Sequence, residues 1–566
     1  MDAECTDVER LHRMLAAGEL VHPYLNREHF KKADDPDTAG TRSPPTANFV
    51  DLSAALALCC GADDEARRNA PGEPELLDGD RRIICSSVEG RGTRRRRMLE
   101  LAAEIGRGPA GGGAGYRRRH IVLILCDGMG NSILNRHLAE EEGSFFRGNN
   151  QPSRLRAVFP STTTAALTSL ATASWPGRHG MPGWNLRDKR GCDLPGTQGG
   201  GVHQPAQLLV LSDRIRDARS GDLASAAGFR WDDVFVEEPW ARKLAAEPKG
   251  SRGSGRRMVY VNAYNGDDYQ DWSQGSTKPG RGGTDFSTWF IGNKGAGGST
   301  CGEGRSLFET SKIGETSFET LGKPEGSAKA IEYFRQGIDA AIRSIREAET
   351  SGESTFVYLY TAHPDMHMHA LGVEHAEVKE VVRGIESEVE RLWTVLGDRN
   401  EMLGGDARAS ESPRVDAAVV VTADHGHVTV DPDDMVQLPE GIVELLEYAC
   451  IGVHGKGRHG YLHCRAGLRD LLRRRWRAED VLRENFLLLT IEEAIDAGLY
   501  GPEPMRVRVR PRLGDFVAVS VGRRTLATPD ELDMFAGAAC RCQGAHGSLL
   551  AEEMEIPFIC LTTEVN

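Results

Sequence analysis

Aspartate and histidine residues recur at the ends of short apolar runs in this sequence. Such runs predict buried β-strands, and open α/β sheets bind their ligands at the carboxyl ends of the strands. Carboxylate oxygens and imidazole nitrogens together suit Zn²⁺ or a similar borderline metal better than Ca²⁺. Four separated segments supply the candidate metal ligands Asp127, Asp365, His369, Asp424, His425 and His546.

The local spacing of these residues favours metal binding over ordinary turns. Asp127 directly follows the apolar run 121–126, and the glycines after it let the backbone turn sharply and leave the carboxylate exposed. Asp365 and His369 are four residues apart, so on a helical turn both side chains face one side and can bind one ion. A single Asp-His-Gly turn is common in proteins, but four such segments, most of them at strand ends, are not.

A run of hydroxyl residues, Ser161 to Thr164, offers a nucleophile. It follows Pro160 and precedes Ala-Ala-Leu, which predicts the start of a helix. Free backbone N–H groups at a helix N-terminus can hold a phosphate beside such a hydroxyl. A bound metal would lower the pKa of the hydroxyl and make it a nucleophile at neutral pH. From residue types alone, any of the four is a candidate, and some of them only cap the helix.

Alternating strand and helix patterns predict the elements that position these residues. Apolar runs predict strands, and apolar residues at helical spacing predict the helices between them. This alternation predicts an α/β fold with a mostly parallel central sheet and helices on both faces. The predicted strands are 121–126, 355–360, 417–421 and 556–561, and the predicted helices are 48–61, 331–345 and 378–395.

Composition divides the chain into expected domains. The first part is expected to be a partly flexible N-terminal extension with a Gly-rich linker at 106–115. Two stretches rich in Gly, Ser and charge are expected to be surface insertions in the catalytic core, and the region that loses the α/β alternation is expected to be an inserted α+β cap. The expected ranges are 1–117 for the extension, 118–435 and 541–566 for the core, 186–205 and 246–306 for the insertions, and 436–540 for the cap.

Charge and hydropathy exclude some classes of function. The 566 residues carry a net charge of −14, from 69 basic and 83 acidic residues, which argues against stable nucleic-acid binding. The runs Arg94–Arg97 and Arg117–Arg119 are expected to be solvated arginines beside a flexible linker. The sequence contains neither a secretory signal at its charged N-terminus nor an apolar run of transmembrane length, so a cytoplasmic protein without a membrane partner is expected.

Taken together, the motifs resemble the alkaline phosphatase superfamily, and within it the bacterial-type branch of the type I phosphodiesterase/nucleotide pyrophosphatase family. The resemblance spans residues 119–185 and 325–562. The motifs that carry it are, in chain order, Cys126-Asp127-Gly-Met, Phe159-Pro-Ser-Thr-Thr163, Thr172 with Pro176-x-x-His179-Gly180, Asp365-x-x-x-His369-x-x-Gly372, Thr422-Ala-Asp424-His425-Gly426 and His546-Gly-Ser-Leu-x-x-Glu-Glu-Met-x-x-Pro557.

The resemblance implies an alkaline phosphatase-like fold and two divalent metal ions, usually zinc, about 4 Å apart. It also implies that Thr163, four residues after Phe159 and nine before Thr172, attacks phosphorus in line and forms a phosphothreonine. Water activated at the second metal would then release the phosphate. The implied ligands are Asp127, Thr163, Asp424 and His425 for one ion, and Asp365, His369 and His546 for the other.

Other histidines compete for these roles or stand beside them. His459 and His463 are alternatives to His546, which is favoured because the Glu-Glu-Met-x-x-Pro of the family follows it. Three histidines adjacent to the ligands are expected to be solvent-exposed bystanders rather than supports for the ligands: His363, His367 and His427.

The expected activity is metal-dependent hydrolysis of a small-molecule phosphate ester or nucleotide, of the phosphodiesterase/nucleotide pyrophosphatase type. Ala166 stands where the eukaryotic ectoenzymes of the family carry an Asn that binds a phosphoryl oxygen, so a phosphomonoesterase or phosphonate hydrolase remains the alternative. A rival class is a catalytically dead nucleic-acid-binding or scaffold protein that uses the arginine runs, and the complete ligand set argues against it.

Overall fold

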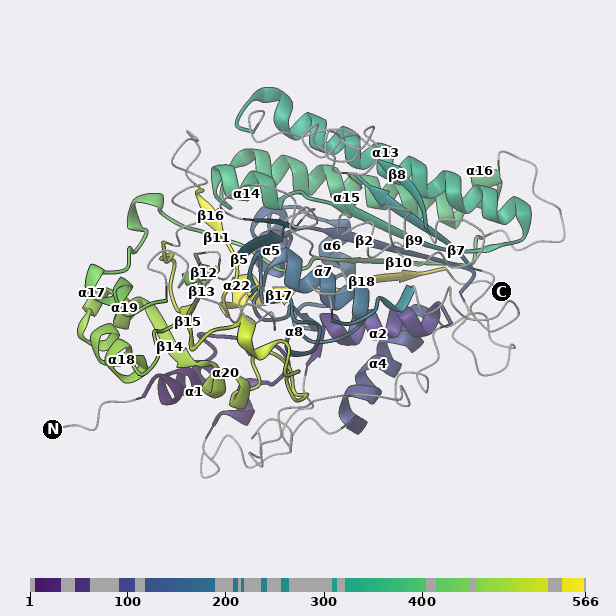
Figure 1. Cartoon of the computed structure of the whole chain (residues 1–566). Coiled ribbons are helices and arrows are strands. Elements are labelled where there is room, and N and C mark those ends of the chain that lie inside the picture. Colours follow the sequence, from purple (N-terminus) through teal and green to yellow (C-terminus); the bar gives the residue numbers. More distant parts are fainter. Residues whose placement is uncertain are drawn as a thin grey trace, which may run out of the picture.

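A six-stranded sheet forms the centre of the molecule (Figure 1). The computed structural model describes residues 6–31, 46–61, 91–106, 118–188, 207–211, 215–217, 236–241, 256–263, 308–312, 321–403, 414–447, 453–455, 457–527 and 542–563. The strand order is β18-β10-β2-β9-β7-β8, and only β18 runs antiparallel to its neighbour. The strands are β2 (His120–Cys126), β7 (Arg256–Asn262), β8 (Phe308–Lys312), β9 (Ser354–Thr361), β10 (Ala417–Thr422) and β18 (Ile559–Thr562). The predicted mostly parallel α/β sheet is confirmed.

The most apolar runs of the sequence lie in the middle of this sheet. Every residue of β2 and β10 is buried, because each strand has a neighbour on both sides and helices over both faces. In Figure 1, α13 (Pro324–Ser351) and α15 (Ala376–Gly397) lie above the sheet, and α2 (Phe49–Cys59), α4 (Arg91–Gly106) and α7 (Thr163–Thr172) lie below it. The predicted apolar stripe of α15 faces the core and includes Val378, Val381, Ile385, Val389, Leu392 and Val395.

One stretch expected to be a surface insertion contains a strand of the central sheet. Residues 256–262, inside the range 246–306, form β7, which pairs with β9 on one side and β8 on the other. Its apolar part, Met258 to Val261, is short and stands between an arginine pair and a Gly-rich segment, so its burial comes from sheet pairing rather than from a long local pattern. Of the range 186–205, residues 186–188 belong to β4 (Asn185–Asp188), and the others lie outside the described residues.

Segments near the N-terminus pack against the same core. Asn48 caps α2 by accepting hydrogen bonds from the backbone of Val50 and Asp51, and nearly the whole helix is buried. The expectation of solvated arginines is wrong for Arg97, which is buried and lies 2.6 Å from the Asp51 carboxylate. Arg118 is also buried and lies 3.0 Å from Asp416. Residues 107–115 of the expected linker lie outside the described residues.

A second, antiparallel sheet lies at the lower left in Figure 1. Its order is β12-β13-β15-β14, with β12 (Val453–Gly455), β13 (His459–Leu462), β14 (Phe486–Thr490) and β15 (Phe516–Ser520). The helices α18 (Arg469–Ala478), α19 (Asp480–Asn485) and α20 (Ile491–Asp496) accompany it, and Trp476, Phe486 and Phe516 belong to an apolar cluster of its own. Residues 510–512 form a 3₁₀ turn shortly before β15.

Shorter elements complete the described part of the chain. Among these residues, no helix is both long and apolar enough to cross a bilayer. The remaining helices are α1 (Asp7–Ala17), α5 (Asn131–Leu138), α6 (Phe145–Asn149), α8 (Pro176–His179), α14 (Asp365–Leu371), α16 (Arg399–Leu403), α17 (Glu440–Val443) and α22 (Ala551–Met554). The remaining strands are β1 (Ala47–Asn48), β3 (Leu155–Arg156), β5 (Gln207–Leu211), β6 (Ile215–Asp217), β11 (Val428–Thr429), β16 (Gly544–Ala545) and β17 (Glu555–Ile556).

Candidate metal centre and nucleophile

The parallel sheet brings three of the candidate segments to one edge. Strands β10, β2 and β9 are adjacent and in register, so their carboxyl ends meet. Asp127 follows β2, Asp365 begins α14 after β9, and Asp424 follows β10. Gly128 has a φ of 71°, and a Cβ at this position would lie 2.9 Å from the Cβ of Asp365. The glycine after Asp127 therefore lets two carboxylate-bearing segments approach closely.

Thr163 is the hydroxyl residue whose side chain lies beside the candidate metal ligands. It is the first residue of α7, whose N-cap is Thr162. Its Oγ1 lies 3.2 Å from His425 Nε2 and 3.4 Å from Asp127 Oδ1. The hydroxyl of Ser161, by contrast, donates to the carbonyl of Ser548 at 2.8 Å.

The first candidate ligand group is the set that the family motifs imply: Asp127, Thr163, Asp424 and His425. His425 Nε2 lies 3.2 Å from Asp424 Oδ2 and 3.5 Å from Asp127 Oδ1. Four ligand atoms placed tetrahedrally at about 2.0 Å from a zinc ion would be about 3.3 Å apart. The separations measured from His425 are close to that value, so the donor atoms of the first group fit a bound metal ion.

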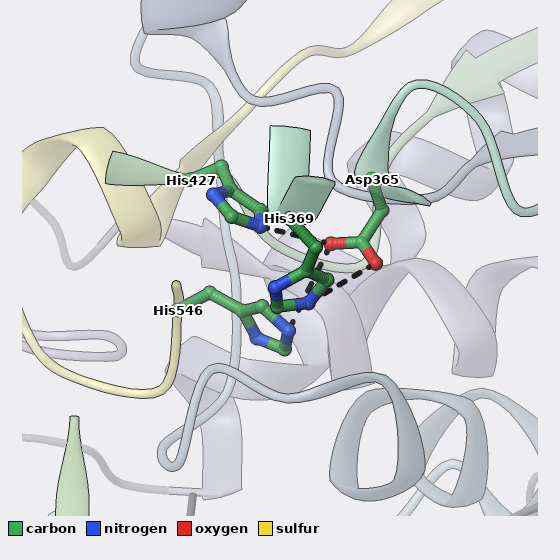
Figure 2. A group of neighbouring side chains, drawn as sticks. All are labelled: Asp365, His369, His427 and His546. Carbon is green, nitrogen blue, oxygen red and sulfur yellow. Dashed lines mark ion pairs between the residues drawn. The ribbon is translucent and has the colours of Figure 1, made fainter. Parts of the chain in front are cut away.

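The second ligand group consists of Asp365, His369, His427 and His546 (Figure 2). Its four ligand atoms lie within 4.8 Å of one another, and all four side chains are buried. Asp365 Oδ2 is 3.4 Å from His369 Nε2, and Oδ1 is 3.3 Å from His427 Nε2 and 3.8 Å from His546 Nε2. Ligand atoms of Asp365, Asp127 and His425 also lie within 4.8 Å of one another, so Asp365 connects the two groups.

Backbone carbonyls orient three of the histidine rings. Nδ1 lies 2.8 Å from the Gly544 carbonyl in His369, 2.9 Å from the Gly426 carbonyl in His425 and 2.8 Å from the Ser161 carbonyl in His546. A ring whose Nδ1–H donates to a carbonyl leaves the lone pair of Nε2 free to bind a metal. In all three, Nε2 points toward a carboxylate of the site.

The electrostatics of the site favour a bound cation. Burial, and after it the carboxylates of Asp424 and Asp365, raise the pKa of Asp127 well above its usual range. Burial raises the pKa of Asp424 to about 7. Burial acts in the same direction on Asp365, but the neighbouring histidines, His369 foremost, hold its pKa well below the usual range. The Tyr360 hydroxyl donates to Asp127 Oδ2 at 2.6 Å. Divalent cations would offset the repulsion among these buried carboxylates.

The other candidate histidines lie elsewhere. His463 Nε2 is 3.0 Å from His454 Nε2, and the ring of His459 packs against Phe159 with centroids 6.3 Å apart. Neither belongs to the two ligand groups, whereas His546 does.

The expectation that three adjacent histidines are solvent-exposed is wrong. His363, His367 and His427 are all buried. His363 and His367 face each other, with their Nδ1 atoms 3.0 Å apart, whereas His427 belongs to the second ligand group. Sequence reasoning missed this role of His427. The available signal was only its position two residues after the candidate ligand His425.

Comparison with known proteins agrees with the motif resemblance. The sequence matches the family described as type I phosphodiesterase / nucleotide pyrophosphatase over residues 121–549, more than half of the chain. A search of curated protein sequences finds no match.

Two similar solved structures are a murine ectonucleotide pyrophosphatase / phosphodiesterase 5 and a phosphonoacetate hydrolase from Sinorhizobium meliloti 1021 in complex with phosphonoformate. The murine protein is 13% identical with a TM-score of 0.44, and the alignment covers 78% of this chain and 87% of that chain. The hydrolase is 17% identical with a TM-score of 0.42, and the alignment covers 78% of this chain and 90% of that chain. On the strength of the family match, this chain belongs to the type I phosphodiesterase / nucleotide pyrophosphatase family of phosphoester hydrolases.

Proposed function

We propose that this protein is a phosphodiesterase or nucleotide pyrophosphatase that uses Thr163 as its nucleophile and two divalent metal ions, in our proposal zinc. The observation that carries the proposal is the position of the Thr163 hydroxyl. It lies at the N-terminus of α7, 3.2 Å from His425 Nε2 and 3.4 Å from Asp127 Oδ1, among buried carboxylates. In a family of phosphoester hydrolases, a hydroxyl placed among metal ligands is the natural attacking group.

The proposed roles of the residues follow from this arrangement. The first group (Asp127, Thr163, Asp424 and His425) would hold one ion, and Asp365, His369 and His546 would hold the other. Bound zinc supplies a lowered pKa for the attacking hydroxyl and stabilises charge on the phosphoryl oxygens. Thr163 Oγ attacks phosphorus, the bond to the leaving oxygen breaks, and a phosphothreonine forms. Water then attacks that phosphorus, returns the threonine and releases the phosphate monoester or phosphate. The backbone N–H groups of the first turn of α7 are placed to bind a phosphoryl oxygen.

Substitutions at the hydroxyl run test the nucleophile. Thr163→Ala is expected to abolish turnover of bis-p-nitrophenyl phosphate, because the attacking oxygen is gone. Thr163→Ser is expected to keep part of the activity, because the hydroxyl remains. Thr162→Ala and Thr164→Ala are matched controls that remove a neighbouring hydroxyl and keep Thr163. Loss of activity in a control together with an active Thr163→Ala protein would refute the assignment of Thr163.

The proposed substrate class is a phosphodiester rather than a monoester. A monoester dianion carries more charge on its non-bridging oxygens, so a dedicated monoesterase should supply extra cationic donors. The nucleophile turn 159–168 contains neither Lys nor Arg, and Ala166 supplies no amide donor. Arg458, beside His459, binds the Glu553 carboxylate at 2.8 Å and is therefore already engaged.

The ratio of two specificity constants tests the substrate class. We expect kcat/KM for bis-p-nitrophenyl phosphate to exceed that for p-nitrophenyl phosphate on the same preparation. A preference for the monoester of about tenfold, equivalent to about 1.4 kcal/mol, would support a phosphomonoesterase on the same metal site instead. A phosphonate hydrolase, the other alternative, would release phosphate from a phosphonate substrate.

We further propose the domain organisation that the composition indicates. In it, residues 118–435 and 541–566 form the catalytic core, residues 1–117 an N-terminal extension and residues 436–540 a cap beside the site. The antiparallel sheet β12-β13-β15-β14 and the apolar cluster that includes Trp476 support the cap, because an independent core is a property of a separate unit.

A further inference from the structure

His427 has no part in the ligand sets that the family motifs imply, yet it lies inside the second ligand group. We propose that His427 is a fourth protein ligand of the second metal site, so that this site binds its ion through one carboxylate and three imidazoles. The inference rests on the two-metal function proposed above and extends it to the identity and strength of the second site.

The geometry around Asp365 supports this role. The two oxygens of the carboxylate face different rings, with Oδ2 3.4 Å from His369 Nε2 and Oδ1 3.3 Å from His427 Nε2. The rings of His369, His427 and His546 are mutual neighbours, with centroids 4.6 to 5.3 Å apart. Figure 2 shows the four side chains converging, with Asp365 and His369 from α14, His427 from directly before β11 and His546 from directly after β16. His427 is thus placed as the other ligands of this group are placed.

The backbone fixes His427 relative to the other ligands. His427 directly precedes β11, and β11 pairs with β16, which directly precedes His546. The backbone N–H of Gln543, just before β16, donates to the His369 carbonyl at 2.8 Å. A Cβ at Gly544 would lie 2.7 Å from Cε1 of His427, so glycine at this position leaves the space that the ring occupies. Three of the four side chains are therefore held by one small strand pair.

The fourth ligand changes the chemistry expected of the site. The second group would offer three neutral nitrogens and one carboxylate, whereas the first offers two carboxylates, one imidazole and the Thr163 oxygen. Nitrogen-rich sets select zinc and similar metals, and oxygen-rich sets also accept Mn²⁺ or Mg²⁺. Both sites would have four protein ligands, so the difference between them lies in the donor atoms, and the second site is the richer in nitrogen. We therefore expect the second site to bind zinc more tightly than the first.

Zinc titration of the apoprotein tests the proposal without an activity assay. The full-length protein is stripped with a chelator and titrated with Zn²⁺ against a chromophoric competitor, and metal content is measured by mass spectrometry. We expect two sites of unequal affinity in the unmodified protein. His427→Ala should weaken the tighter site by about 100-fold or more, and leave the other site unchanged, because it removes a direct ligand. Loss of a residue that only supports a ligand costs about 10- to 100-fold.

Matched variants separate ligation from structural damage. His546→Ala removes an implied ligand of the same site and should weaken the same affinity. His363→Ala removes a buried histidine outside the ligand groups and should leave both affinities unchanged. With Co²⁺ in place of Zn²⁺, His427→Ala should alter the d–d absorption of one bound ion, and His363→Ala should not. If circular dichroism shows that the alanine variant does not fold, His427→Gln replaces it in the titration. We expect the same loss of zinc affinity from His427→Gln.

The possible outcomes distinguish a failure of this proposal from a failure of the two-metal function on which it rests. If the unmodified protein binds no metal, the two-metal function and the role of His427 both fail. If it binds two ions and His427→Ala weakens the tighter site by less than about 100-fold, or leaves the d–d absorption of bound Co²⁺ unchanged, only the role of His427 as a ligand fails. In that case the ring is a hydrogen-bond partner of Asp365.

Discussion

A buried ion pair connects Arg458, which directly precedes β13, to Glu553, which lies seven residues after His546. Neither side chain is exposed. Arg458 Nη2 lies 2.8 Å from Glu553 Oε2, and Nε lies 3.2 Å from Oε1, so the contact is two-pronged. The remaining nitrogen, Nη1, donates to Ser520 Oγ at 2.7 Å and to the Arg524 carbonyl at 3.0 Å.

Replacing Arg458 with methionine is expected to destabilise the protein strongly. Methionine fills part of the volume but leaves Glu553 as a buried carboxylate whose Oε1 accepts from the Ser548 N–H at 3.0 Å. Breaking a buried ion pair from one side costs about 3–5 kcal/mol. Replacing both partners with apolar residues, as in Arg458→Met/Glu553→Leu, leaves no unpaired charge and is often close to neutral. The double variant should therefore be more stable than the single one.

Urea unfolding followed by tryptophan fluorescence measures these differences in the free energy of unfolding. An exposed pair of equal length is the control, because Arg391 Nη2 also lies 2.8 Å from Asp339 Oδ1 while both side chains are well exposed. Arg391→Met should cost less than about 1 kcal/mol. A cost of similar size for Arg458→Met, or a double variant no more stable than Arg458→Met, would refute the reasoning.

Two further predictions concern metal content and pH. Purified protein is expected to contain close to two equivalents of zinc, and exhaustive chelation should abolish hydrolysis until metal is restored; full activity of the stripped protein would exclude the two-metal function. Burial lowers the pKa of His22 and of His179 to about 3, from 6.5. Both rings are neutral in the folded protein, because Nδ1 of each accepts a hydrogen bond from a backbone N–H. The donor to His22 is Leu25, at 3.1 Å, and the donor to His179 is Met181, at 3.1 Å. Since the folded pKa is depressed, the stabilising contribution is complete above pH 6.5 and is lost as the pH falls toward 3, by about 1.4 kcal/mol per pH unit for each histidine. Thermal unfolding between pH 7 and 4.5 should show this slope, and His22→Gln should reduce it; an unchanged slope in that variant would contradict the assignment.

Features that depend on local sequence could be predicted, and features that depend on distant pairing could not. Strands β2, β9 and β10 are continuous apolar runs, so their existence and their place in a parallel sheet follow from the sequence. Strand β7 has only a short apolar run, and its burial depends on pairing with β9 and β8.

The same distinction applies to the candidate site. Asp365 and His369 could be paired from their helical spacing, and the family motif gave the positions of Thr163 and His546. The place of His427 depends on the pairing of β11 with β16, which are far apart in the sequence. Arg97 was misjudged for the same reason, because Asp51, which pairs with it, belongs to a different helix.

The distance along the chain between the candidate ligands has a consequence for how the protein is made. Asp127 is the earliest of them and His546 the latest, so 419 residues (546 − 127) separate the first and last donors. A ribosome adds about 5–20 residues per second, so the interval between them is on the order of 20–80 s. The carboxylates of Asp365 and Asp424 are added during that time, but the nascent chain lacks the last imidazole until its end, and β18 has not yet covered the edge of β10. His546 belongs to the second group, so we expect the second ion to be acquired only after synthesis has passed His546. Supply of metal to the finished chain, rather than to the growing one, should then set how much protein carries both ions.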